Sequence, residues 1–142
     1  MKAILCALDF TETSDQVIKV ALELAAQKHT NLVVLYAYRL LQPKNQDIAE
    51  YRKDIETRAR EDFDGIVKRL HINGDVPYEF RSEIGFLSDR IEVYLKKHAV
   101  DVIVMSQSLA HNINEHKGLT FEHFLDSTKI PVLVVPEMFE AA

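Results

Sequence analysis

The chain has 142 residues, of which 47% are hydrophobic and 27% charged, and these ordinary globular values exclude a disordered or membrane-embedded chain. Its 17 Lys and Arg against 22 Asp and Glu give a formal charge of -5, with the basic residues scattered among the acidic ones. Non-specific nucleic-acid binding is therefore not expected, and neither is a membrane partner.

The N-terminal stretch predicts a buried strand followed by a helix. Residues 2–8 form an apolar run that is too short for a secretory signal, so a cytoplasmic location is expected. The single cysteine, Cys6, lies inside this run and is interpreted as a small buried hydrophobe rather than a reactive thiol. Thr13 and Gln16 have the spacing of a capping box, and apolar residues at helical spacing follow to about His29.

A second strand and a long helix are predicted next. The apolar run Leu32–Tyr38 reads as a strand, and the polar connection Arg39–Asn45 follows it. A helix is expected from about Gln46 to Leu70, ended by the turn sequence Asn73-Gly74-Asp75. Its charged stretch from Tyr51 to Asp62 is interpreted as a solvated face. The positions expected to point inward are Ile48, Tyr51, Ile55, Phe63, Ile66 and Leu70.

The third strand is predicted to lie near an edge of the sheet. Pro77–Ile84 alternates two sets of residues, one of them charged, as a half-covered strand does. Gly85 then turns the chain, at a place where a positive φ would require glycine. A helix from about Phe86 to His98 leads to the fully apolar strand Asp101–Met105.

The C-terminal part predicts a loop, a helix and a last strand. The polar stretch Ser106–Lys117 reads as a loop, a short helix follows from about Gly118 to Thr128, and Val132–Val135 is the final strand. The chain is thus expected to hold five strands and four helices in a single domain over residues 1–142. No internal repeat interrupts this order.

Alternating strands and helices predict an α/β fold, with a five-stranded parallel sheet covered by helices on both faces in a Rossmann-like arrangement. The expected strand order is 3-2-1-4-5. In such sheets ligands bind beyond the carboxyl ends of the strands where the winding reverses, here between the first and fourth strands. Residues 9–11 and 106–108 are therefore expected to face each other across a crevice.

Several pieces of the sequence resemble the universal stress protein family. They are the first strand ending in Asp9, the Gly85 turn, the Asp101–Met105 strand and the terminal run Ile130–Val135. This resemblance covers essentially the whole chain and implies the α/β fold and a role in the stress response. ATP-binding members carry Gly-x2-Gly-x9-Gly-Ser/Thr after the fourth strand. The corresponding residues here are Ser106, Leu109, Leu119 and Thr120.

The resemblance therefore places the chain in the class that lacks the glycine-rich loop. Glycine lets a loop adopt positive φ and bring its N–H groups against phosphate oxygens, and all three glycines are replaced. Leu109 and Leu119 are expected to obstruct the phosphate path or to turn inward and bury apolar area. No cofactor is expected, with ATP or AMP as the alternative. The candidate cofactor contacts are Asp9, Ala37, Ser106 and Thr120.

Each candidate also has a local interpretation. Asp9 can cap the turn that follows it, and loop hydroxyls such as Ser106 and Thr120 are common without a ligand. The loop histidines have no compact zinc spacing, so no metal is expected. Ser106 and His111 could suggest a nucleophile and base, but the Gly-x-Ser-x-Gly elbow is absent, so no enzyme is expected.

Three functional classes follow in order. The first is a homodimeric regulatory or interaction protein of the stress response, with unknown protein partners and without ATP. The second is a regulator that binds ATP or AMP through an altered loop, and the third is an enzyme. The dimer is expected to form through the uncharged edge strand Val132–Val135, since a bare edge of this kind invites aggregation. A tail from Glu137 to Phe139 folded over that edge is the alternative.

Overall fold

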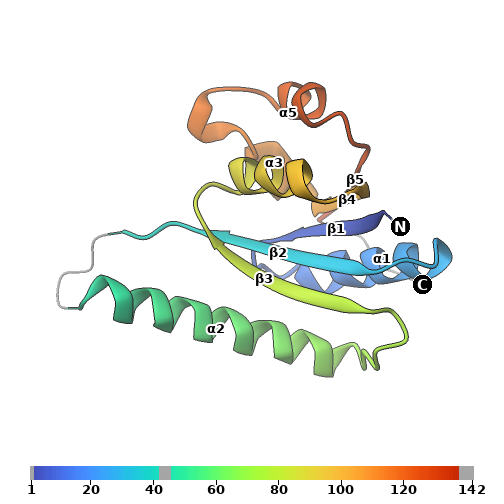
Figure 1. Ribbon diagram of the computed structural model, residues 1–142, viewed down its shortest axis with the longest axis horizontal. Helices are drawn as coiled ribbons and strands as arrows, with labels where there is room; N and C mark the ends of the chain where they lie inside the picture. The colour runs from blue at the N-terminus through green and yellow to red at the C-terminus, as the bar shows by residue number, and fades with distance from the viewer. Residues whose placement is uncertain (1, 42–45, 138–142) are drawn as a thin grey trace.

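The computed structural model describes residues 2–41 and 46–137, and these form one parallel five-stranded sheet with helices on both faces (Figure 1). The strand order is β3-β2-β1-β4-β5, which confirms the predicted order and fold class. All paired strands are parallel. The strands are β1 (Ala3–Leu8), β2 (Leu32–Tyr38), β3 (Tyr78–Ile84), β4 (Val100–Ser106) and β5 (Val132–Val135).

The central strand β1 is buried along its whole length because helices cover both of its faces. Side chains alternate between faces with a period of two, so Ile4 and Leu5 enter different cores. Cys6 lies opposite Val34 of β2 and Val104 of β4 and is fully buried, as predicted. Burial raises the pKa of the Cys6 thiol to about 12, because the charged thiolate would lose its hydration.

One face of the sheet packs against α1 (Ser14–Gln27) and α2 (Ile48–Arg69). The predicted capping box at the start of α1 does not form. Thr13 is the N-cap, but its φ of -84° and ψ of -5° are already helical and its side chain makes no capping bond. The Thr13 hydroxyl lies instead 3.1 Å from the hydroxyl of Thr11.

The helix α2 extends beyond the sheet that it covers (Figure 1). Its 22 residues span about 33 Å at 1.5 Å per residue, whereas the seven residues of β3 span about 23 Å. The buried residues, Ala59, Phe63 and Ile66, therefore all lie in its second half. The prediction that Ile48 points inward is wrong, since it is 48% exposed. Residues 42–45 of the predicted connection lie outside the described residues.

The other face of the sheet packs against α3 (Leu87–Lys97), α4 (Gln107–Asn112) and α5 (Phe121–Thr128). Gly85 joins β3 to α3 with a φ of 131°, and its N–H donates to the Tyr38 carbonyl at 2.8 Å. The edge position predicted for β3 is confirmed, because β3 pairs only with β2 among the described strands. No helix of the described residues carries a stretch apolar and long enough to cross a membrane.

The stretch predicted as a polar loop after β4 is largely helical. It contains α4 and a short 3-10 helix over Glu115–Lys117, so the described residues hold five α-helices instead of the four expected. Two features explain the difference. The Ser106 hydroxyl accepts a hydrogen bond from the Leu109 N–H at 3.2 Å, and Ala110 and Ile113 are buried in the core.

Candidate functional site

Asp9 lies at the carboxyl end of β1, at the point where the sheet reverses its winding. Its Oδ1 accepts hydrogen bonds from the backbone N–H of Thr11 at 3.4 Å and from the Thr11 hydroxyl at 3.0 Å. Asp9 thus closes the local turn between β1 and α1, which is the first of its two predicted roles. The half-buried carboxylate keeps a second oxygen for which the described residues provide no hydrogen bond.

Ser106 lies at the carboxyl end of the neighbouring strand β4 and is buried. Its hydroxyl caps α4 by accepting from Leu109 and lies 3.4 Å from the Ser108 hydroxyl. The next free N–H of this turn, that of Ser108, donates to Oε1 of Glu137 at 2.6 Å. Both N–H groups at the start of α4 are therefore occupied by side chains of the protein itself.

Glu137 connects the two loops that were expected to face each other. The N–H and hydroxyl of Ser108 lower the pKa of the Glu137 carboxyl, and the Thr13 hydroxyl adds a weaker contribution in the same direction. Thr13 belongs to the loop after β1 and Ser108 to the loop after β4, so one carboxylate lies beside both. The sequence prediction did not single out Glu137. The available signal was an acidic residue just beyond the last strand, since all carboxyl ends of a parallel sheet share one edge.

The other two candidate contacts lie apart from this carboxylate. Thr120 is exposed and caps α5, where its hydroxyl accepts from the His123 N–H at 3.1 Å. Ala37 pairs in register with Glu83 of β3 and is half-buried. No hydrogen bond among the described residues joins Thr120 to Asp9 or Ser106. The structure therefore brings the neighbourhoods of Asp9 and Ser106 together, and gives Ala37 and Thr120 separate surroundings.

The two leucines that replace loop glycines behave differently. Leu109 is partly buried and packs against the core between the sheet and α3, as expected. Leu119 is 40% exposed, so the prediction that it turns inward is wrong. The reason is the preceding residue, Gly118, which adopts a φ of 65° and turns the chain out of the 3-10 helix before α5 begins.

His116 has a packing role at this end of the sheet. Its ring stacks on Phe86 with 3.8 Å between ring centroids, and the Arg39 guanidinium lies 4.5 Å from the centroid of the same Phe86 ring. Lys117 forms an ion pair with Asp89 at 2.7 Å. These contacts fasten the segment after α4 onto α3. Within residues 2–41 and 46–137, no cluster of three His, Cys, Asp or Glu is arranged to hold a metal ion.

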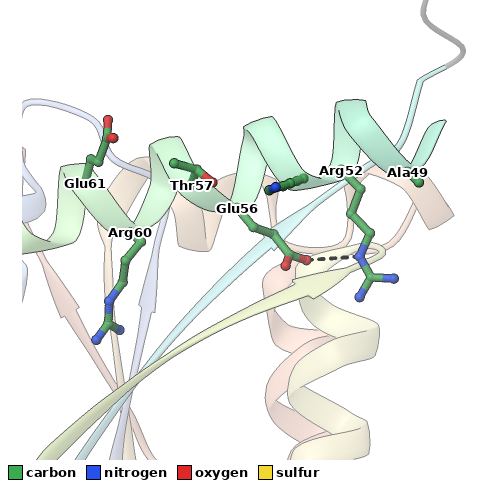
Figure 2. Close-up of a pocket in the computed structure, with 7 residues that line it drawn as sticks. Ala49, Arg52, Glu56, Thr57, Arg60 and Glu61 are labelled. Atoms are coloured by element: carbon green, nitrogen blue, oxygen red, sulfur yellow. Dashed lines mark hydrogen bonds and ion pairs between the residues drawn. The ribbon is translucent and has the colours of Figure 1, made fainter. Parts of the chain in front are cut away.

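A groove of about 480 Å³ runs along the outer side of α2 (Figure 2). Arg52, Glu56 and Arg60 extend from one side of the helix, and Glu61 points away on the other (Figure 2). Arg52 pairs with Glu56 at 3.1 Å, and Arg60 pairs with Asp64 at 3.7 Å. Because these charges satisfy one another along a single helix, the groove is a solvated surface and not a ligand site.

Comparison with known proteins points to one family. A family model described as the universal stress protein family matches residues 1–136. No curated protein sequence is similar enough to match the chain. Among solved structures, a universal stress protein family member from Burkholderia pseudomallei is 26% identical and aligns with a TM-score of 0.70, over 95% of this chain and 96% of that one.

Two further solved structures are similar in fold and contain nucleotides. A universal stress protein family protein from Arabidopsis thaliana with AMP bound is 16% identical, with a TM-score of 0.61, over 96% of this chain and 92% of that one. A universal stress protein in complex with cAMP is 18% identical, with a TM-score of 0.65, over 95% of this chain and 96% of that one.

Proposed function

The chain belongs to the universal stress protein family, and on that premise we propose that it is a homodimeric, non-catalytic protein of the stress response that acts through protein contacts without ATP. Its place of action in this proposal is the cytoplasm. The observation that carries the proposal is the occupied turn after β4, where the N–H groups of Ser108 and Leu109 already have partners within the chain.

Nucleotide affinity depends on several N–H groups that converge on phosphate oxygens. Here the Glu137 carboxylate lies on the Ser108 N–H, and a phosphate approaching the same point would meet a negative charge as well as a missing donor. The Leu109 side chain is packed in the core, so opening the turn would also expose apolar area. These features favour a protein that does not use ATP.

The surroundings of Ser106 support the non-catalytic part of the proposal. Its hydroxyl is buried, and its neighbours are the Leu109 N–H and the Ser108 hydroxyl. Neither can take a proton from it as a general base, whereas a serine nucleophile requires such a base within hydrogen-bond reach. Asp9, the other candidate, is engaged by Thr11.

The edge strand β5 supports the homodimer. It pairs with β4 on one side and with no other strand of the described residues, and its four residues carry no charge. Leu133 is 41% exposed on this strand. Addition of the same strand from a second copy would satisfy the open backbone groups. Of the tail proposed as an alternative cover, only Glu137 lies within the described residues, and its carboxylate lies on Ser108.

A nucleotide-binding regulator is the second candidate, favoured by Gly118. This residue has a φ of 65° directly before the position of the third family glycine, and Thr120 follows at the start of α5. A one-residue shift of the loop would place this glycine at the family position. Nucleotide-bound relatives of the same fold make AMP and cAMP the natural ligands to test beside ATP.

Calorimetric titration with ATP and magnesium tests the choice between the two. We expect no binding in the low micromolar range for the natural chain, and binding in that range would overturn the proposal. A triple variant with Ser106→Gly, Leu109→Gly and Leu119→Gly tests the cause. It should gain affinity if backbone access is what is missing. If it stays folded and still ignores ATP, the loop explanation is wrong although the natural chain behaves as expected.

A further inference from the structure

A second cavity lies on the opposite side of the sheet from α4, between the carboxyl ends of β1 and β2 and the first half of α2. Its volume is about 460 Å³, within the roughly 300–1,000 Å³ typical of small-molecule sites. Phe10, Tyr36 and Tyr38 contribute from the sheet side, and Ile55, Arg58 and Asp62 contribute from α2. The cavity exists because α2 continues past the region where it packs on the sheet.

The sheet side of the cavity is an aromatic wall. The rings of Phe10 and Tyr36 meet edge to face with centroids 4.9 Å apart, and those of Tyr36 and Tyr38 stack at 6.0 Å. Phe10 adopts a φ of 56°, a left-handed backbone that is rare for a bulky residue and is found mostly where the surrounding structure enforces it. This conformation places the Phe10 ring at the junction of the cavity and the core.

The α2 side of the cavity is held in place by a hydrogen-bonded chain. The Tyr38 hydroxyl donates to the Glu56 carboxylate, and Arg52 Nε donates to the same carboxylate at 3.1 Å. Burial raises the pKa of Tyr38 to about 12, and its bond to Glu56 acts in the same direction. The hydroxyl therefore stays protonated and keeps donating at physiological pH. The cavity is thus preformed, because the overhanging part of α2 is tied to β2.

The charge available to a ligand in this cavity is positive. Among the described residues no carboxylate lies within ion-pair distance of Arg58, whereas its neighbours Arg52 and Arg60 on the same helix are both paired. Arg58 and Asp62 both act on the Tyr36 hydroxyl, in opposite directions, so both face the aromatic wall. Arg39 adds a second positive charge at the rim, and together the two arginines outnumber Asp62.

This cavity is separate from the crevice where strands β1 and β4 diverge. Tyr36 and Tyr38 alternate with Ala37 along β2, so the tyrosines point toward α2 and Ala37 points toward α3. Ser106, Ser108 and Glu137 do not line it. Loss of nucleotide binding at the crevice and ligand binding here are therefore independent properties.

We propose that this cavity binds a small planar aromatic carboxylate, with its ring against Phe10 and Tyr36 and its carboxylate on Arg58. Flat rings match the aromatic wall by offset or edge contacts. An arginine fork binds a carboxylate through two parallel N–H bonds, which makes Arg58 the selective group. A neutral ring would lack this bond, and a cationic one would meet two arginines.

The test uses 2-naphthoate as the probe. The chain contains no tryptophan, so naphthoate fluorescence can be excited where the protein does not absorb. We expect a saturable change with the natural chain, and an affinity about tenfold or more lower with Arg58→Gln, as for loss of a charge-assisted hydrogen bond. Arg58→Lys should restore part of the affinity. Arg60→Gln is the matched control and should bind as the natural chain does.

Two further measurements make the result decisive. Neutral 2-naphthamide should bind the natural chain no better than naphthoate binds Arg58→Gln. Amide chemical-shift changes should centre on residues 36–38 and 55–62 rather than on 106–109. Absence of saturable naphthoate binding, equal affinity in Arg58→Gln that melts like the natural chain, or shifts centred on 106–109 would each overturn the proposal.

Discussion

The Glu137 carboxylate accepts the Ser108 N–H at 2.6 Å, across 29 positions of the sequence. This bond joins the end of β5 to the start of α4, at the edge of the sheet where universal stress proteins with nucleotides have their ligand-facing loops. A carboxylate on this N–H carries the same sign of charge as a phosphate. The contact is therefore the feature of this chain whose removal says most about its crevice.

Titration of this contact is the first prediction. Hydrogen bonds from Ser108 hold the pKa of Glu137 below its usual value of 4.5, so the contact is complete above that value and is lost as the pH falls through the lowered pKa. The amide signal of Ser108 in a nitrogen–proton spectrum should follow this titration. Glu137→Gln should abolish the pH dependence, and Glu12→Gln, at an exposed position, should leave it. A Ser108 amide insensitive to pH in the natural chain would contradict the contact.

Substitution of Gly85 is the second prediction. Its φ of 131° lies outside the left-handed region near +57° that L-residues visit, and a Cβ would lie 3.2 Å from Cδ of Arg90. Gly85→Ala should lower the free energy of unfolding by about 1 kcal/mol or more. Gly118→Ala is the control, because its φ of 65° is within that region and a Cβ would meet nothing within 4 Å. Denaturant unfolding measures both, and an equal or smaller loss at Gly85 would show that its turn is ordinary.

The third prediction concerns Cys6. Its thiol is fully buried with a pKa raised to about 12, against 9.0 for an ordinary cysteine. In the folded protein it should resist thiol reagents at neutral pH and react only on unfolding. From pH 9 upward the unfolded thiol ionises while the folded one does not, so stability falls as the pH rises toward 12.

A matched variant isolates this effect. From pH 8 to pH 10 the stability difference between the natural chain and Cys6→Ala should shrink by about 1.4 kcal/mol, since one pH unit above the unfolded pKa is worth that amount. Other titrating groups cancel in the difference. A pH-independent difference, or fast labelling of the folded protein, would show that Cys6 is accessible.

Disruption of the edge strand is the fourth prediction. In the proposed dimer, Leu133→Lys places a charge on β5 and should convert the dimer to a monomer at micromolar concentration, as measured by light scattering. Leu119→Lys is the matched control, because Leu119 is 40% exposed against 41% for Leu133 but lies outside the strand. A natural chain that is monomeric at this concentration would remove the dimer from the proposal.

Local periodicity was sufficient for the elements and their order. Leu32–Tyr38 and Val132–Val135 were predicted with the bounds that the structure gives, because short apolar runs between polar turns have few other interpretations. The strand order followed from the right-handed crossovers that parallel strands require. The polar stretch after Ser106 was misread as a loop, since its helix depends on the burial of Ala110 and Ile113, which neighbours distant in the sequence provide.

The sequence by itself determined the fold, the family and the absence of the loop glycines, since these depend on residue types and their spacing. Only the tertiary structure decided which groups meet at the crevice and where α2 leaves the sheet. Glu137 reaches Ser108 because β4 and β5 end at the same edge, and Arg58 faces Tyr36 because the helix is longer than the strands beneath it. Such meetings depend on how far elements run and which neighbours they bring, and no local pattern encodes either.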